Sequence, residues 1–277
     1  LMVEYHAHNT NKGTEEIKGD GLTHGNTMKK RRIDFLITLI PASNSVFPLL
    51  NVKFRNSTLF GKISVSEPAL TVRSSSLCLL QVETGDLGDV YKIRVSCDDV
   101  PGFEGWHLKS FHLEELHTKQ ELNFDCKCWL SLNREDKELV KEFPAVNEDQ
   151  KTLPVYKYVV SVHIGDRWGA ETFANVYITL YGKRGDTGVR KLHTSLAEGR
   201  KFQRNKVDSF LVEAVSLSHL QKVVIGHDKE GYGAGMYLKM VTVKESQDSD
   251  KEWVFPWWNW LDTHLGLCET VCEIVTV

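Results

Sequence analysis

Apolar and polar residues alternate along much of the second half of the chain. Between residues 155 and 164 the even-numbered positions are apolar: Tyr156, Tyr158, Val160, Val162 and Ile164. A period of two residues is typical of a β-strand with one buried face. The same pattern predicts further strands at residues 174–180, 188–192, 209–215, 220–227, 236–244, 252–257 and 270–277. Short strands separated by turn residues favour an antiparallel β-sandwich for residues 155 to 277.

The chain also contains an internal repeat. Residues 79 to 109 align without a gap with residues 209 to 239, so that VETGDLGDVYKIRVSCDD lies over VEAVSLSHLQKVVIGHDK. With one residue added in the later copy, FDCKCWL at 124–130 lies over FPWWNWL at 255–261. Shared strand, turn and glycine positions predict two tandem copies of one module. The polar segment PAVNEDQKTLP suits an exposed connection, and we place a linker at residues 146–154.

The first copy is predicted to be an atypical or incomplete module. Residues 33 to 76 contain apolar runs but no counterpart of the opening strands of the second copy. Such a module exposes sheet edges unless residues 33 to 76 substitute for those strands. We therefore assign residues 33 to 145 to a partial module. No regular structure is expected in residues 1 to 32, which are rich in Asn, Lys, Gly and Thr.

Composition narrows the classes of function. The 34 Lys and Arg against 37 Asp and Glu give a net charge of -3, so the chain lacks the basic field of nucleic-acid-binding proteins. Six cysteines in 277 residues are too sparse for a disulfide scaffold, and reduced thiols in a cytoplasmic protein are expected. The sequence shows no serine nucleophile elbow, Walker loop or paired-carboxylate motif, so we predict no catalytic residues and no enzymatic activity.

Several segments together resemble the PLAT domain, named for polycystin, lipoxygenase and α-toxin. They are GDRWGAETFANVYITLYGKRGDTGVRKL, KFQRNKVDSFLVEA, KVVIGHDKEGYGAGMYLKMVTV and FPWWNWLD. The resemblance covers residues 155 to 277 and the latter half of a repeat at about 78 to 143. It is greatest to the lipoxygenase homology domain-containing proteins of hair-cell stereocilia, which are built of serial PLAT repeats. It implies an all-β fold of tandem PLAT-type antiparallel β-sandwiches, each of two four-stranded sheets.

For function, the resemblance implies a non-catalytic module that docks to membrane lipid, to membrane proteins or to cytoskeletal proteins. Its expected place is cytoplasmic, peripheral at the plasma membrane, as in stereocilia. Two alternatives stay open: a protein-interaction scaffold without lipid affinity, and a calcium-dependent lipid sensor. Tandem copies suit docking through several weak contacts, because tethered sites gain avidity.

Calcium is the one cofactor that the resemblance brings in. In PLAT domains that bind calcium, a loop resembling GAGTDA supplies oxygens, whereas residues 169 to 174 here read GAETFA. Phe173 replaces the expected Asp, which removes one oxygen ligand. Asp166, Glu171 and Asp208 are the remaining candidates, and calcium takes six to eight oxygens with several of them anionic. A weak or absent site is expected, and turn capping by Asp166 and Asp208 is the alternative.

Trp168 is the main candidate for membrane contact. It lies in a predicted loop between Arg167 and Gly169, and Trp favours the bilayer interface because its ring is apolar and its N–H polar. Arg167, with Lys183 and Arg184 on another loop, adds affinity for anionic lipid if the three share a face. The alternative is that Trp168 folds back as a lid over the end of the sandwich.

A cluster of tryptophans supplies the last candidate contact. On an uninterrupted strand, Trp253 and Trp257 share one face while Trp258 and Trp260 share the other. One face belongs to the core, and the second is expected to meet another domain or a partner. Trp257 is taken as a membrane or partner contact.

Overall fold

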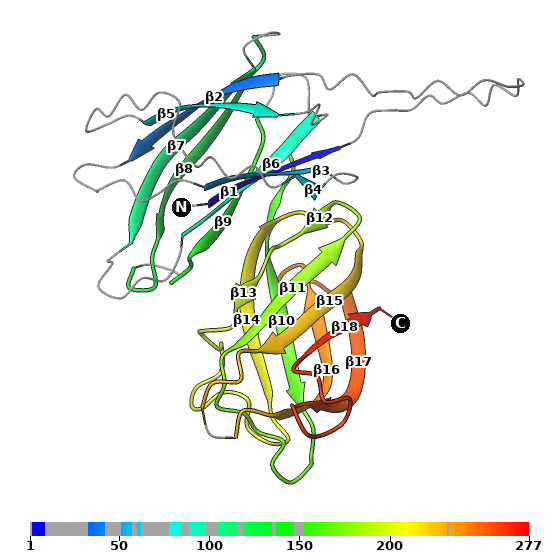
Figure 1. Cartoon of the computed structure of the whole chain (residues 1–277). Coiled ribbons are helices and arrows are strands. Elements are labelled where there is room, and N and C mark those ends of the chain that lie inside the picture. The colour runs from blue at the N-terminus through cyan, green and yellow to red at the C-terminus, as the bar shows by residue number, and fades with distance from the viewer. Residues whose placement is uncertain are drawn as a thin grey trace, which may run out of the picture. The chain divides into compact units, whose positions relative to one another are not determined.

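The computed structural model divides the chain into two compact units, Leu1–Leu153 and Pro154–Val277. The structure describes residues 2–8, 33–41, 51–56, 60–61, 78–84, 89–97, 105–115, 119–134, 137–146, 152–231 and 233–276. Every regular element among these residues is a β-strand (Figure 1). No helix in the described part of the chain has the length and apolar character needed to cross a bilayer.

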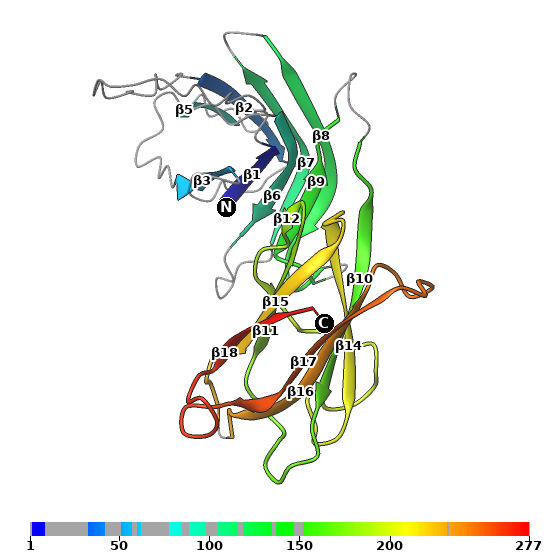
Figure 2. The same ribbon diagram turned by 90° about the vertical axis from the view of Figure 1, so that its right-hand side faces the viewer.

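The second unit is a sandwich of two antiparallel sheets, seen edge-on in Figure 2. One sheet has the order β14 (Val207–Val215), β10 (Val155–Ile164), β16 (Met236–Lys244), β17 (Glu252–Leu261). The other has the order β12 (Gly185–Asp186), β11 (Val176–Gly182), β15 (Leu220–His227), β18 (Val271–Val275), and β13 (Arg190–Lys191) also pairs with β11. The predicted antiparallel sandwich is confirmed, although β13 is much shorter than the strand predicted at 188–192.

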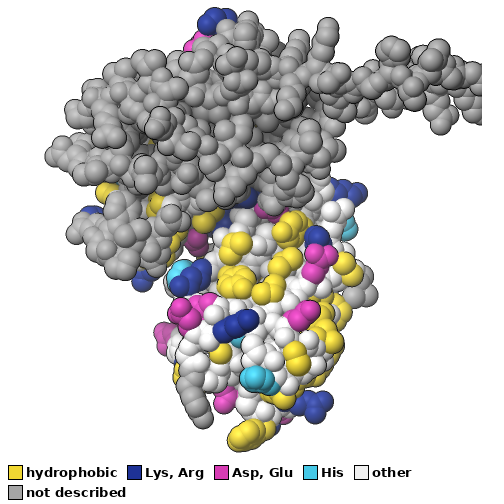
Figure 3. Space-filling model, in the orientation of Figure 1, with side chains coloured by type: hydrophobic (Ala, Val, Ile, Leu, Met, Phe, Trp, Pro, Cys, Tyr) yellow, Lys and Arg dark blue, Asp and Glu magenta, His cyan; other side chains and the backbone are white. Residues whose placement is uncertain are grey.

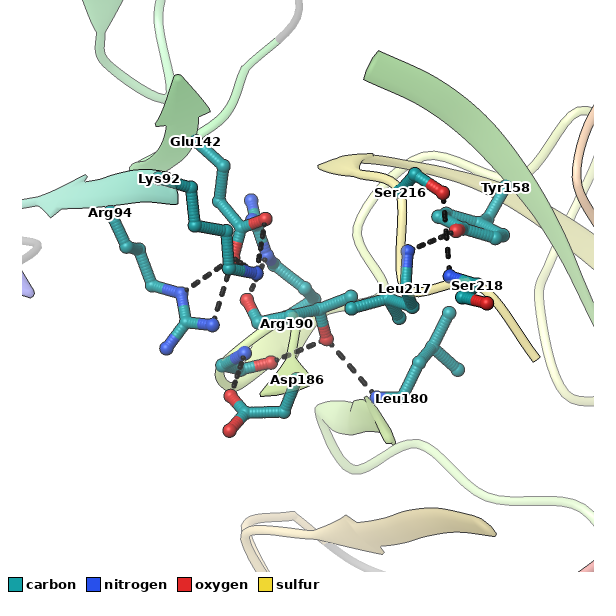
Figure 4. A network of polar contacts seen from close by, with 12 residues as sticks. Lys92, Arg94, Glu142, Tyr158, Leu180, Asp186, Arg190, Ser216, Leu217 and Ser218 are labelled. Atoms are coloured by element: carbon teal, nitrogen blue, oxygen red, sulfur yellow. Dashed lines mark hydrogen bonds and ion pairs between the residues drawn. The ribbon is translucent and has the colours of Figure 1, made fainter. Parts of the chain in front are cut away.

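The core of the second unit lies between its sheets and follows the alternation of the sequence. In β10, Tyr158, Val160 and Val162 are fully buried, and they pack in one cluster with Ile178, Val223, Val241 and Phe255, among others. Tyr158 also accepts a hydrogen bond through its hydroxyl from the backbone N–H of Leu217 at 2.9 Å, as Figure 4 shows. This bond satisfies a buried donor in the connection between β14 and β15.

The first unit has two sheets of its own. One has the order β4 (Phe60–Gly61), β3 (Asn51–Asn56), β1 (Met2–His8), β6 (Asp89–Ser96), β9 (Val140–Pro144). The other has the order β5 (Cys78–Thr84), β2 (Ile33–Pro41), β7 (Trp106–Glu115), β8 (Glu121–Leu130). Within the first sheet, Lys92 and Arg94 of β6 both pair with Glu142 of β9, at 2.9 and 2.8 Å (Figure 4). These ion pairs link the neighbouring strands β6 and β9 through their side chains.

The repeat predicted from the sequence is present in the strand registers. The order β5-β2-β7-β8 has its counterpart in β14-β10-β16-β17. The pairing of β7 with β8 shifts between Leu108 and Ser110, and that of β16 with β17 shifts between Leu238 and Met240. These positions coincide in the alignment of the two copies. Both units therefore carry the same β-bulge.

Strand β1 occupies in the first unit the position that β11 has in the second. β1 pairs with β6 and β11 pairs with β15, both antiparallel, and the two registers shift at matching places, between His6 and Ala7 and between Tyr181 and Gly182. Yet β1 precedes β2 in the chain, whereas β11 follows β10. The first unit is atypical in its strand order and in β3, which pairs with β1 in parallel.

This arrangement decides one open alternative for the first copy and corrects one expectation. Residues 33 to 76 do provide an opening strand, because β2 takes the place of β10 beside β5 and β7. Residues 2 to 8 form a strand, although no regular structure was expected there. Residues 9 to 32, which carried the same expectation, lie outside the described residues. The alignment of the two copies did not detect β1, because β1 precedes β2 in the chain whereas its counterpart β11 follows β10.

Candidate docking surface of the second unit

Four loops meet at one end of the second unit, here called the loop end. They are residues 165–175, 192–206, 228–235 and 262–270. Register places them together, since His163 pairs with Val207, Val176 with His227, Gly226 with Val271 and Met236 with Leu261. Figures 1 and 2 show these loops at the end of the unit away from β12. A β-sandwich presents its loops in this way for contact with other molecules.

Trp168 lies at the tip of the first of these loops. The N–H of Ala170 donates to the carbonyl of Arg167 at 3.1 Å, and Gly169 takes a positive φ of 74° to complete the turn. Ala170 is fully buried and anchors the loop, while the Trp168 ring is 90% exposed. The ring does not fold back over the sandwich, so the lid alternative is wrong.

Other apolar side chains are exposed around Trp168. Phe173 is 63% exposed in the same loop, and the other loops present Leu196, Leu265 and Leu267. In Figure 3 hydrophobic surface lies at the lowest tip of the unit, where Figure 1 shows the loop end. Exposed apolar side chains gathered at one place mark a contact site more often than scattered ones do.

Arginines lie against several of the aromatic rings. The guanidinium of Arg200 is 3.5 Å from the centre of the Phe173 ring, and that of Arg167 is 5.4 Å from the centre of Tyr237. Lys201 is held differently, because its Nζ donates to the carbonyls of Leu192 and His193 at 2.9 and 2.7 Å. Partial burial lowers the pKa of Lys201. Lys201 therefore stabilises the loop through these hydrogen bonds, while Arg167 and Arg200 face solvent.

Lys183 and Arg184 lie at the opposite end of the second unit. They form the turn between β11 and β12, where their N–H groups donate to the carbonyls of His219 and Leu217. Strand β11 has seven residues and separates this turn from the loop end by about 20 Å. The condition that these cations share a face with Arg167 is not met, because one full strand lies between them.

Trp257 is not an exposed contact, because its ring packs against the core of the second unit. Its neighbour Trp258 is the exposed one, at 57%, and Lys239 lies 5.0 Å from the centre of its ring. Trp258 has a positive φ of 55° in the bulge of β17, so alternation breaks at this point. Pro256 was the available signal, since proline inside a strand favours edge strands and bulges.

The three candidate calcium ligands are engaged in different ways. Asp166 Oδ1 accepts from Arg204 Nε at 2.6 Å. Asp208 is buried and accepts from the Phe202 N–H at 2.7 Å and from the Ser195 hydroxyl at 3.1 Å. Asp208 thus caps its own loop, as the alternative proposed, whereas Asp166 forms an ion pair.

Glu171 does not complete a calcium site with the other two acids. Its Oε2 is buried and has no hydrogen-bond partner within the described residues. A single carboxylate falls short of the several anionic oxygens that calcium requires. Across the described residues no three His, Cys, Asp or Glu side chains form a group that could hold a metal. The residues present do not fit calcium.

The loop end is also fixed by a carboxylate that sequence reasoning did not single out. Asp228 accepts from the side-chain amide of Asn175 at 2.6 Å and from the N–H groups of Asn175 and Glu230 at 3.2 and 3.0 Å. Slight desolvation alone would raise the pKa of Asp228, but these hydrogen bonds outweigh it and lower that pKa. Asp228 therefore ties the loop of Trp168 to the loop that follows β15.

Similarity to known proteins agrees with this fold. Residues 158–266 match the PLAT/LH2 domain family. Human lipoxygenase homology domain-containing protein 1 is 38% identical over 184 residues, which are 66% of this chain and 9% of that protein. Mouse Polycystin-1-like protein 3 is 33% identical over 138 residues, which are 50% of this chain and 6% of that protein. The chain thus spans less than a tenth of the length of these curated relatives.

Among solved structures, the crystal structure of coral 8R-lipoxygenase is similar to 44% of this chain and 17% of that chain, with 22% sequence identity and a TM-score of 0.37. The family match at residues 158–266 lies within the second unit and includes strands of both of its sheets. PLAT domains mediate membrane and protein interactions and are not themselves catalytic. The second unit of this chain is a PLAT domain, and the chain is a PLAT-domain protein.

Proposed function

We propose that the second unit docks the chain onto an anionic membrane through its loop end. The observation that carries the proposal is Trp168, whose ring is 90% exposed at a loop tip that buried Ala170 holds in place. Such exposure of a large ring is unfavourable in water, and the interface of a bilayer suits both the ring and its N–H. Insertion of the ring removes that exposed apolar surface from water.

The charges of the loop end support one orientation on a membrane. Residues 165–175 and 192–208 together carry five Lys and Arg and four Asp and Glu, whereas residues 228–235 and 262–270 together carry one Lys and four Asp and Glu. Trp168 lies in the cationic half. Anionic headgroups attract that half and repel the other, so we expect the domain to tilt toward the loops that contain Trp168 and Arg200.

Vesicle co-sedimentation of the full chain tests this function. Wild-type chain is expected to sediment with phosphatidylserine-containing vesicles more than with phosphatidylcholine vesicles, and Trp168→Ala is expected to weaken this binding about tenfold or more. Val275→Ala is the control, because Val275 is 64% exposed and pairs with Lys222 toward the other end of the sandwich. Equal binding by wild type and Trp168→Ala would refute the proposal.

A second candidate function, a protein-interaction scaffold, is favoured by the outer face of β14, β10, β16 and β17. The exposed apolar side chains of this face include Val155, Val207, Leu211, Val254 and Trp258. Apolar side chains on an outer sheet face suit contact with another protein more than contact with water. A chain that binds neither kind of vesicle would favour this function over membrane docking.

The place of this docking in the cell is part of the proposal. We propose a position at the cytoplasmic side of the plasma membrane, where the chain would link lipid to cytoskeletal or channel proteins, with hair-cell stereocilia as the site, as the sequence resemblance implies. Imaging a tagged chain in hair cells tests this. Wild type is expected at the membrane, and Trp168→Ala is expected to be diffuse. Diffuse wild-type chain would contradict the location.

A further inference from the structure

We propose that the loop end binds anionic membranes without calcium, and that Asp166 restrains this binding by neutralising Arg204. The inference rests on the proposed membrane docking and assigns its regulation. In place of a metal that bridges carboxylates to lipid, the loops present their own cations. One of these cations is partly cancelled by a neighbouring carboxylate.

The candidate calcium ligands do not act together. Asp208 is 5% exposed, and its two carboxylate oxygens accept hydrogen bonds from Phe202 and Ser195. It is therefore part of the interior of its loop. Asp166 faces solvent in an ion pair. Removing Asp208 from its partners would leave a buried N–H unsatisfied, which opposes any rearrangement toward a shared metal.

Arg204 and Asp166 form a close ion pair that is open to solvent. The nitrogen and oxygen are 2.6 Å apart, and the two side chains are 46% and 61% exposed. The N–H of Asn205 donates to the carbonyl of Gly165 at 3.2 Å, which keeps the two loops side by side. The pair therefore lies on the solvent side of the cationic loops. An approaching phosphate would compete with Asp166 for the same guanidinium.

The other arginines of these loops contact aromatic rings. Arg200 and Arg167 each have the guanidinium beside an aromatic ring, of Phe173 and Tyr237. Contact with a ring uses the face of the guanidinium and leaves its N–H edges for phosphate oxygens. Of the arginines in these loops, Arg204 is the one whose N–H edge is turned to a carboxylate in the described residues. Asp166 thus acts on a single cation.

The two roles for Asp166 predict opposite effects of one substitution. A calcium ligand would be lost in Asp166→Asn, and membrane binding would fall. If Asp166 instead restrains Arg204, the same substitution would release the guanidinium, and the net charge of residues 165–175 and 192–208 would rise by one. Because a cation near an anionic membrane contributes about 1 kcal/mol, we expect Asp166→Asn to bind phosphatidylserine vesicles about fivefold more tightly in the presence of a calcium chelator.

Arg204 provides the matched control. Arg204→Gln is expected to weaken vesicle binding, and Asp166→Asn is expected to gain much less in the Arg204→Gln background, because the released cation is then absent. Such non-additivity is the signature of a direct pair. Equal gains from Asp166→Asn in both backgrounds would show that Asp166 acts only through total charge and would overturn its assigned partner.

The experiment combines vesicle co-sedimentation with calorimetric titration of calcium chloride into the full chain without lipid. We expect no saturable calcium binding, equal vesicle binding in chelator and in millimolar calcium, and tighter binding by Asp166→Asn. Saturable calcium binding that is lost in Asp166→Asn would overturn the inference while leaving membrane docking intact. Wild-type chain that binds no phosphatidylserine vesicle in either condition would instead refute the proposed function.

Discussion

The first and second units share a backbone plan but present different outer surfaces. On β8 the exposed positions are Glu121, Asn123, Asp125 and Lys127, and the equivalent positions of β17 are Glu252, Val254, Pro256 and Trp258. Both are edge strands. Charges keep an exposed edge from pairing with other chains, and β17 has replaced most of its charges by apolar residues. Contacts with a partner or a membrane are therefore expected at β17 of the second unit more than at β8 of the first unit.

The largest expected effect tests whether the two units are stabilised separately. Phe124 and Phe255 are equivalent in the repeat, and each is almost fully buried. Phe124→Ala and Phe255→Ala are each expected to cost about 3–5 kcal/mol of unfolding free energy, in the mutated unit. Hydrogen exchange followed by mass spectrometry locates the loss. Faster exchange in both units after either substitution would show that they fold as one cooperative body.

A smaller effect is expected from making the second unit like the first at one buried hydroxyl. Tyr158 of β10 and Phe35 of β2 stand at equivalent register positions, opposite Val212 and Val82. Tyr158→Phe removes the acceptor for the Leu217 N–H. A buried unsatisfied donor costs about 1–3 kcal/mol, so we expect a loss in this range by chemical denaturation.

Tyr156→Phe is the control for that substitution. It deletes a hydroxyl from the same strand, and Tyr156 is only partly buried at the edge of the core. We expect a change below about 0.5 kcal/mol, as for most substitutions near the surface. Equal costs for the two variants would mean that the bond to Leu217 does not contribute to stability.

Much of this fold was predictable from the sequence because one face of each strand of the second unit is buried. Alternation placed β10 at its observed bounds, and the repeat aligned β7 with β16. The arrangement of the first unit was not predicted, because β1 fills the place of β11 from an earlier point in the chain. An alignment that follows chain order cannot detect that exchange, since the equivalence exists in the sheet register.

The position of Trp168 in a loop was predictable from the sequence, whereas the identity of the exposed tryptophan on β17 was not. For Trp168 the sequence left two alternatives open, an exposed ring and a lid over the end of the sandwich. Trp257 and Trp258 exchanged roles because a bulge with a positive φ at Trp258 interrupts the alternation. Lys127 has a positive φ of 41° at the equivalent place in β8. Neither residue is glycine, so the residue type at these two positions does not reveal the positive φ, and Pro256 was the available signal for the bulge in β17.

The smallest expected effect is a difference in pH dependence between the two units. His163 of β10 is equivalent to Ile40 of β2, opposite Met240 and Ser110. Desolvation lowers the pKa of His163 below 6.5, helped by Lys239 and opposed by Glu252. Between the folded and unfolded pKa values the unfolded chain binds the additional proton, so folding weakens as pH falls below 6.5 and levels off below the folded pKa.

His163→Gln isolates this contribution. We expect the variant and wild type to differ in the pH slope of stability of the second unit below pH 6.5, with the steeper loss in wild type, and to run parallel above it. Chemical denaturation across this pH range, with hydrogen exchange assigning the transition to each unit, provides the measurement. The first unit, which has Ile40 at this position, should keep the same slope in both proteins. Parallel curves for the second unit through the whole acidic range would mean that His163 is as well solvated in the folded chain as in the unfolded one.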